Sequence, residues 1–203
     1  MHMLYRAAIL LLFIITLPLQ IGIAVLVFVT SGLPILFIQR RIGKMGRLFD
    51  LYKFRTMEVD AEKKQRFLLS QNESSGPTFK IRMDPRFTYL GAFLSHTGLD
   101  EIPQFINVLR GDMSLIGPRP LPVAECRRLQ PWMRKRECVK PGIISPAILQ
   151  GDYHKDFTAW MKSDVAYARD KNMRSDLLLF ARAVIFLLHA IYRELTYGMS
   201  RCV

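Results

Sequence analysis

From residue 7 to residue 38 the sequence is strongly apolar and contains no charged side chain. A helix needs about 20 apolar residues to cross the hydrocarbon core of a bilayer, and the apolar part of a signal peptide is shorter than this stretch. Pro18 stands in its middle, where it removes a backbone hydrogen bond and clashes with the preceding turn. The pattern predicts a membrane helix that is either a kinked single span or a re-entrant helix whose ends leave on one face.

A cluster of positive charge follows immediately, at Arg40, Arg41, Lys44 and Arg47. Because the cytoplasmic flanks of membrane helices carry an excess of Lys and Arg, this cluster places the following chain in the cytoplasm. We therefore expect residues 1–38 to form the membrane segment. Residues 39–203 are expected to form a domain at the cytoplasmic face, and any chemistry belongs to it.

The next part of the chain alternates between strand-like and helix-like patterns. Residues 48–57 are rich in β-prone side chains, and a helical pattern covers residues 58–70. Gly, Pro, Ser and Asn mark residues 71–77 as a loop. Residues 78–82 alternate apolar and polar side chains, as a half-buried strand does, and a helical pattern resumes at residues 87–95 after a turn.

A short helix of about ten residues is predicted next, because apolar side chains recur at helical spacing at positions 102, 105, 106 and 109. Thr97 is a suitable N-cap, and Gly111 is a suitable residue just after the helix end. Asp100 and Glu101 then fall in the first turn. Residues 122–138 read as basic and partly helical, and residues 139–146 as a loop.

The last long pattern, at residues 175–198, has a wide apolar face interrupted by Arg182, His189 and Arg193. It fits an amphipathic helix on a membrane surface and equally a helix in the core of the domain. Together the patterns predict an α+β fold that is mostly helical.

Composition adds a strong positive charge to this picture, with 29 Lys and Arg against 17 Asp and Glu. Three classes of partner suit such a chain: an anionic membrane surface, nucleic acid, or a phosphorylated substrate. The cysteines, Cys126, Cys138 and Cys202, are odd in number and widely spaced, which fits a reducing compartment better than a disulfide framework or a zinc site.

Two adjacent carboxylates, Asp100 and Glu101, are the first candidates for chemistry. Acidic side chains are common at helix starts, where the helix dipole stabilises them by roughly 0.3–1 kcal/mol. An ionised carboxylate in such a position also binds Mg²⁺ or attacks phosphorus. Consecutive helical residues do not share a face, so the two groups would need different roles.

Basic side chains supply candidate phosphate ligands, each with a structural alternative. Arg119 lies between two prolines that stiffen its loop, so it suits bidentate binding of phosphate, or it is a surface arginine. Lys53 and Arg55 share one face of an extended segment and form either a phosphate or headgroup patch or a solvated strand face. Arg86 follows Asp84 across a turn, and an aspartate before a proline commonly just initiates such a turn.

Taken in order, the motifs RRIGKMGRLFDLYKFRTM, GPTFKIRMDPRFTYLGAFL, GLDEIPQFINVLRGDMSLIGPRP and VKPGI resemble the bacterial sugar transferases, which are monotopic phosphoglycosyl transferases. The resemblance covers about residues 7–142. It implies a re-entrant membrane helix, a small catalytic domain with amphipathic surface helices, and a place at the cytoplasmic face of the bacterial inner membrane.

The family reaction moves a sugar-1-phosphate from a nucleotide-diphosphate sugar, typically a UDP-sugar, to polyprenyl phosphate such as undecaprenyl phosphate. By resemblance, Asp100 is the nucleophile that forms a covalent phosphosugar and is associated with Mg²⁺. Glu101 is its acid/base or positioning partner, and Arg119 lies near phosphate. Four further residues match family motif positions with less defined roles: Lys53, Arg55, Asp84 and Arg86. Of these, Lys53, Arg55 and Arg86 are candidate substrate-binding residues.

The chain departs from the family pattern at three places. Leu17 stands where a serine precedes the helix-breaking proline, and Thr16 is placed to replace its hydroxyl in part. Gly98 stands where the family usually has serine, and residues 143–150 diverge near the expected nucleotide or sugar. The sugar and the nucleotide base are therefore left open.

Two other functions compete with the enzyme. A non-enzymatic basic adaptor bound to membrane phospholipids accounts for the charge but not for the Asp-Glu pair and the Gly-Pro-Arg-Pro motif together. A membrane-tethered nucleic-acid binder lacks interleaved aromatic and basic side chains on a strand, so we expect no nucleic acid partner. The sequence is compatible with an oligomer and does not specify one.

Overall fold

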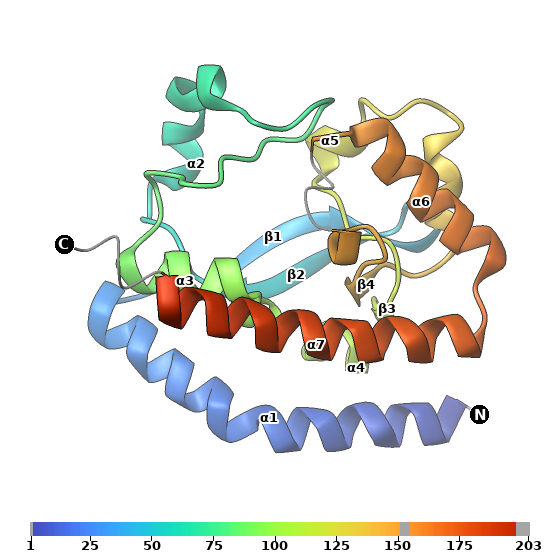
Figure 1. Cartoon of the computed structure of the whole chain (residues 1–203), viewed down its shortest axis with the longest axis horizontal. Helices are drawn as coiled ribbons and strands as arrows, with labels where there is room; N and C mark the ends of the chain where they lie inside the picture. Colours follow the sequence, from blue (N-terminus) through green and yellow to red (C-terminus); the bar gives the residue numbers. More distant parts are fainter. Residues whose placement is uncertain (1, 151–154, 198–203) are drawn as a thin grey trace.

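The computed structural model describes residues 2–150 and 155–197, and in these residues the fold is α+β and mostly helical, as predicted. Figure 1 shows helices arranged around two small sheets. The helices and strands, in chain order, are α1 (His2–Ser31), β1 (Leu36–Ile42), β2 (Leu48–Phe54), α2 (Ala61–Lys64), α3 (Tyr89–Thr97), α4 (Phe105–Arg110), β3 (Ser114–Ile116), α5 (Val123–Cys126), β4 (Gly142–Ile144), α6 (Phe157–Asp170) and α7 (Met173–Tyr197). Short 3-10 turns η1 (Lys44–Gly46), η2 (Gln65–Gln71), η3 (Leu99–Gln104), η4 (Met133–Cys138) and η5 (Ile148–Gln150) connect them.

Helix α1 contains Pro18 and is bent near its middle (Figure 1). The proline removes one backbone donor, which explains a bend without ending the helix. The Thr16 hydroxyl donates to the Leu12 carbonyl at 2.9 Å, and Gln20 donates to that hydroxyl at 3.1 Å. Thr16 thus supplies a hydroxyl two residues before Pro18, next to Leu17, which stands where the resemblance leads one to expect serine.

One narrow stripe of α1 packs on the domain, and the rest of the helix is uncovered. Ile9, Ile23 and Val27 are buried against β2, α3 and α4. Most other apolar side chains of the helix are exposed, and the largest exposed fractions in its membrane-length part are those of Leu4, Leu11, Ile15, Ile21, Val25 and Val29. Because exposed apolar surface of this extent is unfavourable in water, α1 requires an apolar environment.

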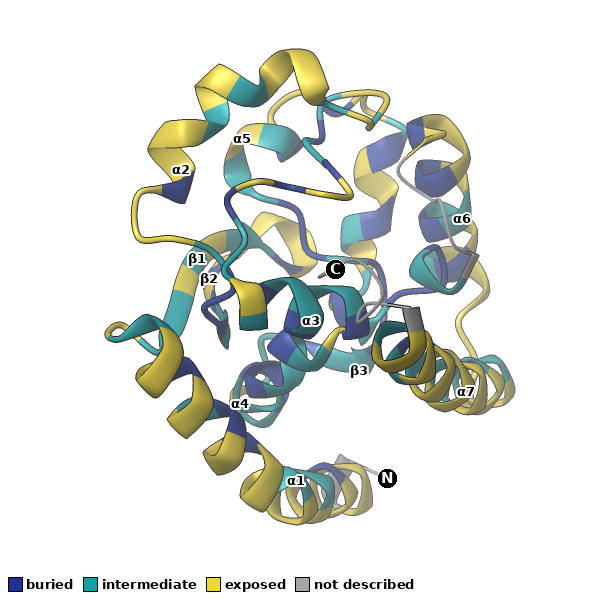
Figure 2. Cartoon of the chain, turned by 60° about the vertical axis from the view of Figure 1, so that its left-hand side comes forward, coloured by how far each residue is buried: buried dark blue, intermediate teal, exposed yellow. Residues whose placement is uncertain are grey.

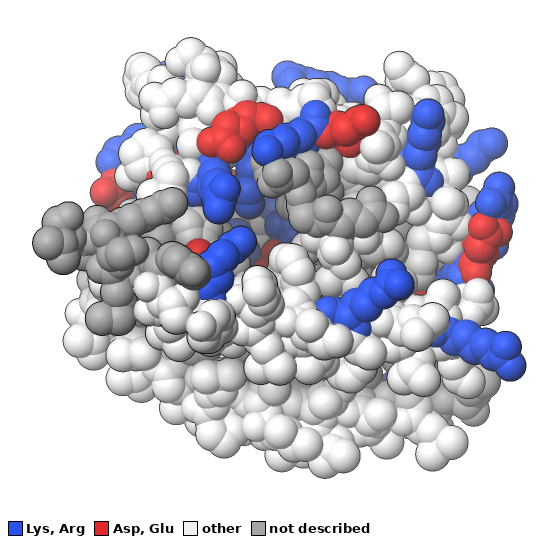
Figure 3. Space-filling model, viewed as in Figure 1, with Lys and Arg blue, Asp and Glu red and all other residues white. Residues whose placement is uncertain are grey.

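Helix α7 shares this property. It is long and apolar enough to cross a membrane, as α1 is, and exposes large side chains such as Leu177, Ile185 and Leu188. The alternative of a core helix is therefore wrong. Both helices lie along the same side of the molecule in Figures 1 and 2. Figure 3 shows that the part of the surface formed by α1 is almost free of charge, whereas Lys, Arg, Asp and Glu gather in the opposite half.

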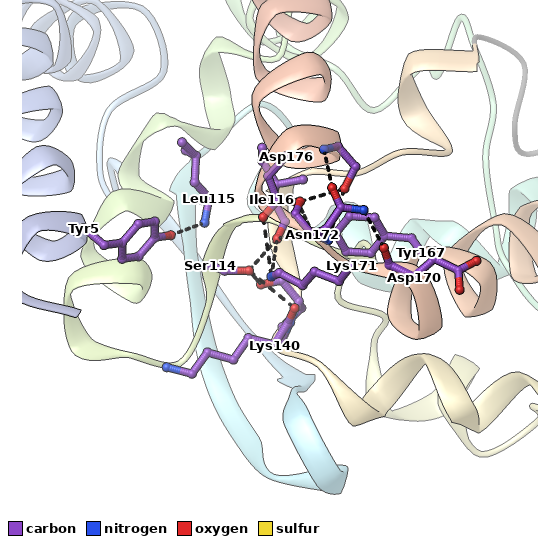
Figure 4. Close-up of polar contacts among 12 residues, drawn as sticks. Tyr5, Ser114, Leu115, Ile116, Lys140, Tyr167, Asp170, Lys171, Asn172 and Asp176 are labelled. Atoms are coloured by element: carbon purple, nitrogen blue, oxygen red, sulfur yellow. Dashed lines mark hydrogen bonds and ion pairs between the residues drawn. The ribbon is translucent and has the colours of Figure 1, made fainter. Parts of the chain in front are cut away.

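Strand β3 anchors both apolar helices (Figure 4). The Leu115 N–H donates to the Tyr5 hydroxyl of α1 at 2.9 Å. The Tyr167 hydroxyl of α6 lies 3.1 Å from the Ile116 carbonyl oxygen and 2.7 Å from Asp176 Oδ1 of α7. These contacts fix the first turns of α1 and α7 relative to one strand, so the two apolar surfaces are held together.

Strands β1 and β2 form an antiparallel hairpin that gives the domain its frame. In this register Phe37, Gln39 and Arg41 face the same side as their partners Lys53, Leu51 and Phe49. The exposed side chains of Ile38 and Arg40 point to the opposite side. The hairpin confirms the strand expected at residues 48–57 and reveals a strand at residues 36–42, whose start had been assigned to the membrane segment.

Three local expectations were wrong. Residues 78–82 form no strand, because the Asn72 side chain binds the Thr78 carbonyl and the Lys80 N–H and holds the segment as a loop. Thr97 is not an N-cap; it ends α3, and its hydroxyl donates back to the Phe93 carbonyl. The chain then turns through Gly98, and the predicted helix is divided into η3 and α4, with Gly111 after its end as expected.

The third correction concerns residues 142–144, which were expected in a loop and form β4, paired in parallel with β3. The two chains approach so closely that a Cβ atom on Gly142 would lie 2.0 Å from the Gly117 nitrogen. Of the cysteines, Cys126 is buried and Cys138 exposed, both free, and Cys202 lies outside the described residues.

We expect Gly142→Ala to destabilise the domain by roughly 3 kcal/mol, because overpacking against fixed backbone forces the strands apart. Thermal unfolding of the detergent-solubilised protein measures this. Gly22→Ala in α1 is the matched control, since its Cβ meets nothing within 4 Å. Equal melting temperatures for both variants would contradict the close approach.

Candidate active site

Asp100 lies in the first turn of η3, and its residue is only 3% exposed. The Lys53 ammonium nitrogen at the end of β2 stands 3.6 Å from Asp100 Oδ2. Burial raises the pKa of Asp100 to about 6, and the charge of Lys53 opposes that rise. At neutral pH the carboxylate is therefore still ionised, and it is more basic than an ordinary aspartate.

Glu101 points to a different partner, as adjacent residues in a tight turn must. Its Oε1 lies 2.8 Å from Nη1 of Arg119. Burial alone would raise the pKa of Glu101, but the charge and hydrogen bond of Arg119, with Lys53 and Arg41, outweigh it and hold the pKa below its ordinary value. The two carboxylates thus differ in basicity because their cationic neighbours differ.

The loop that carries Arg119 is held by two further arginines. Arg41 Nη1 donates to the Pro120 carbonyl at 2.8 Å, and Arg136 donates to the Arg119 carbonyl. Arg136 is itself buried and pairs with Asp164 of α6 at 2.7 Å. These contacts orient the loop, so that the Arg119 side chain faces η3.

Lys53, Asp100, Glu101 and Arg119 are therefore brought together, and Arg55 and Arg86 are not part of this group. Arg55 is 6% exposed, and its guanidinium donates to the Ser31 and Gly32 carbonyls at the end of α1. Lys53 and Arg55 do not form one patch, because β2 ends at Phe54 between them.

Arg86 is also buried, and it forms a two-pronged ion pair with Asp84, with nitrogen–oxygen distances of 2.9 and 2.6 Å. Its third contact is the Ala61 carbonyl at 3.0 Å. These bonds join the turn at residues 83–86 to α2. In this structure both Arg55 and Arg86 hold backbone segments beside the site.

Sequence reasoning missed a cavity of about 120 Å³ next to Arg119. Arg41 of β1, Lys80 of the 78–82 loop and Glu125 of α5 are its other charged lining residues. Adjacent Arg40 and Arg41 look equivalent in the sequence. If residues 36–42 are assigned to a strand, the two arginines fall on opposite faces of it, because neighbouring side chains in a strand point in opposite directions.

The site contains a carboxylate of the kind that can bind a divalent metal ion. The described residues contain no group of three or more His, Cys, Asp or Glu side chains suited to a metal. Mg²⁺ is usually held by one or two carboxylates together with substrate phosphates and water. Asp100 fits one such ligand, since Glu101 is engaged by Arg119.

Comparison with known proteins decides the family, because the bacterial sugar transferase family matches residues 2–190. The chain belongs to this family. The match includes η3, the Arg119 loop and both apolar helices except the last turns of α7. The family predicted from the motifs is therefore confirmed.

Individual family members share substantial identity with the chain. The galactosyl transferase CpsE of Streptococcus agalactiae serotype III is 43% identical over 72% of this chain and 33% of its own length. An undecaprenyl-phosphate galactose phosphotransferase of Salmonella typhimurium is 33% identical over 77% of this chain and 34% of its own length.

A UDP-glucose:undecaprenyl-phosphate glucose-1-phosphate transferase of Escherichia coli is 36% identical over 79% of this chain and 34% of its own length. The chain thus spans about a third of the length of these three sugar transferases. Their shared segment is the one that contains the buried carboxylates.

Proposed function

We propose that this protein transfers a sugar-1-phosphate from a nucleotide-diphosphate sugar, most simply a UDP-sugar, to polyprenyl phosphate. The observation that carries the proposal is the buried Asp100 carboxylate, with Lys53 on one side and the Glu101–Arg119 pair on the other. Phosphoryl transfer needs an aligned nucleophile and positive charge around the phosphate oxygens, and these residues supply both. The relatives named for undecaprenyl phosphate support the acceptor.

In the proposed first step an Asp100 carboxylate oxygen bonds to the sugar-side phosphorus of the donor. The bond from that phosphorus to the bridging oxygen breaks, and the nucleoside monophosphate leaves with the electron pair. In the second step a phosphate oxygen of the lipid bonds to the same phosphorus. The bond to Asp100 breaks, so the carboxylate is regenerated and a polyprenyl diphosphate-linked sugar is released.

Asp100 suits the role of nucleophile better than Glu101. Its pKa of about 6 gives a carboxylate that is ionised at neutral pH and is more basic than usual. Glu101 is held by Arg119 at 2.8 Å, which lowers its pKa and ties up one oxygen. Glu101 therefore positions Arg119 on the phosphate oxygens, and Lys53 stabilises the charge that develops there.

Mg²⁺ would be held by Asp100 and by the diphosphate of the donor. It would supply a Lewis acid that withdraws charge from the phosphate oxygens. Before the donor binds, Lys53 holds the Asp100 carboxylate in place at 3.6 Å. The neighbouring carboxylate, Glu101, is paired with Arg119 instead.

The uncovered helices support a reaction at a membrane. We propose that α1 is re-entrant, bent at Pro18, with both ends at the cytoplasmic face of the bacterial inner membrane and with α7 on the membrane surface. This arrangement brings the site to the headgroup plane, where a polyprenyl phosphate presents its charge. A non-enzymatic adaptor accounts for the apolar helices but leaves the buried carboxylates without a purpose.

Asp100→Asn is expected to abolish turnover, with a loss of about a thousandfold or more, because an amide is not a nucleophile toward phosphorus. The measurement is release of nucleoside monophosphate by purified protein with Mg²⁺, a UDP-sugar and undecaprenyl phosphate. Intact mass should show a phosphosugar adduct on the unsubstituted protein without acceptor, and none on the variant. Asp50→Asn is the control, because Asp50 is exposed on the other face of the hairpin; full turnover by Asp100→Asn would refute the covalent mechanism.

Chelation of divalent metal should stop turnover and leave the fold unchanged, since no cage of three protein ligands exists in the described residues. Turnover with EDTA and then with added Mg²⁺ measures the first effect. Circular dichroism in both conditions measures the second. Undiminished turnover in EDTA would remove Mg²⁺ from the proposal.

The re-entrant helix predicts that both ends of α1 are reached from one side. Leu4→Cys and Leu33→Cys, both at exposed positions, are introduced into a chain whose three native cysteines are replaced by serine. In inverted inner-membrane vesicles an impermeant maleimide should label both. Labelling of position 33 alone would show a single span instead.

A further inference from the structure

The cavity beside Arg119 is lined by three cations and one carboxylate. Arg41, Lys80 and Arg119 come from three separate segments, and Glu125 lies among them. The remaining walls are apolar or uncharged and include Phe79 and Trp160. Three positive side chains around a space of about 120 Å³ suit the binding of an anion, because a cleft lined by charges of one sign attracts ligands of the opposite sign.

Arg41 is fixed at the edge of this cavity. The N–H of its neighbour Ile42 donates to the Leu121 carbonyl at 3.2 Å, and Arg41 Nη1 donates to the Pro120 carbonyl at 2.8 Å. The guanidinium is thus joined to the same loop that carries Arg119. Its Nε is buried and has no hydrogen-bond partner among the described residues, which is unusual for such a strong donor.

Electrostatics support the presence of an anion between the two arginines. Burial, together with the positive charge of Arg119, lowers the pKa of Arg41 to about 10, with only partial compensation from Glu125 and Glu101. The charge of an anionic ligand in the cavity would favour the protonated form of Arg41 and offset the repulsion from Arg119, since it would pair with the two guanidinium groups at once.

The hairpin aligns this cavity with the nucleophile. Lys53 and Arg41 lie on the same face of the hairpin, and Lys53 is paired with Phe37, four residues before Arg41. Four residues of a strand span about 13 Å, so the two cations mark opposite ends of one face. Asp100 contacts Lys53 at one end, and Arg119 reaches from Glu101 to the cavity at the other.

The cavity is remote from α1. Its lining elements α5 and α6 lie on the side opposite to α1 in both Figure 1 and Figure 2. A lipid phosphate would approach from the side of α1 and α7. A water-soluble phosphate compound can enter from the other side.

We propose that this cavity binds the departing nucleotide, with Arg41 and Arg119 on its phosphate and Glu125 accepting hydrogen bonds from its ribose hydroxyls. Arg41 is then a further substrate-binding residue. A carboxylate would repel inorganic phosphate, whereas a nucleotide offers it hydroxyl donors. The proposal rests on the proposed function, and it assigns a place to the product that this function requires.

The experiment measures binding of uridine monophosphate to the purified full-length protein without donor or acceptor, by calorimetry and by fluorescence of Trp160 in the cavity wall. Arg41→Gln should raise the dissociation constant about tenfold or more, since a charge-assisted hydrogen bond is lost. The matched control is Arg40→Gln, because Arg40 is the exposed neighbour on the other face of β1. It should bind as tightly as the unchanged protein.

Lys80→Gln is the second variant, because the hydrogen bonds described for Lys80 are made by its backbone. It should also weaken nucleotide binding, and it keeps the test decisive if Arg41→Gln does not fold. Inorganic phosphate is titrated in parallel and should bind more weakly than the nucleotide. Equal binding of the two ligands, or nucleotide binding unchanged by both Arg41→Gln and Lys80→Gln, would overturn the assignment.

Turnover separates this inference from the proposed function. If Arg41→Gln and Lys80→Gln keep the Michaelis constant for the nucleotide sugar while Asp100→Asn is inactive, the cavity assignment fails and the reaction stands. If the unchanged protein releases no nucleoside monophosphate from any nucleotide sugar, the reaction itself fails, and the cavity assignment fails with it.

Discussion

Two adjacent carboxylates, the buried Asp100 and the half-buried Glu101, lie at the meeting point of several segments, and the arrangement of the surrounding chain depends on neutralising them. A buried carboxylate is costly unless it is paired and hydrogen-bonded. Asp100 obtains its partner from the hairpin and Glu101 from the loop at residues 117–120. The hairpin, η3 and this loop must therefore meet at one point. The same requirement explains why the loop is fixed by Arg41 and by the buried pair of Arg136 with Asp164.

The two carboxylates differ in pKa because their cationic partners differ. Asp100 faces a lysine at 3.6 Å and keeps a raised pKa, whereas Glu101 faces an arginine at hydrogen-bond distance and keeps a lowered one. In the proposed reaction the more basic group attacks phosphorus, and the other orients the arginine that binds a phosphate oxygen. This division of roles follows from which partner each side chain reaches, and adjacency in the sequence ensures that they reach different ones.

The molecule also has two distinct sides. Strand β3 anchors the start of α1 through Tyr5 and the start of α7 through Tyr167 and Asp176, so the two uncovered helices form one apolar side. The cationic cavity opens among α5, α6 and the 78–82 loop on the other side. The site lies between them. The proposed reaction would use both sides, with a water-soluble donor and a lipid-anchored acceptor approaching the same carboxylate from opposite directions.

The sequence by itself determined the apolar stretch, its proline, the mostly helical class, the family and the Asp-Glu and Gly-Pro-Arg-Pro motifs, because these depend on local composition and on order along the chain. It did not determine which charges meet. Lys53 and Arg55 look alike two residues apart, yet one faces Asp100 and the other holds the end of α1, because β2 ends between them. Residues 78–82 have the alternation of a strand but no partner strand. Pairing of distant segments decides such questions, and only the tertiary structure contains it.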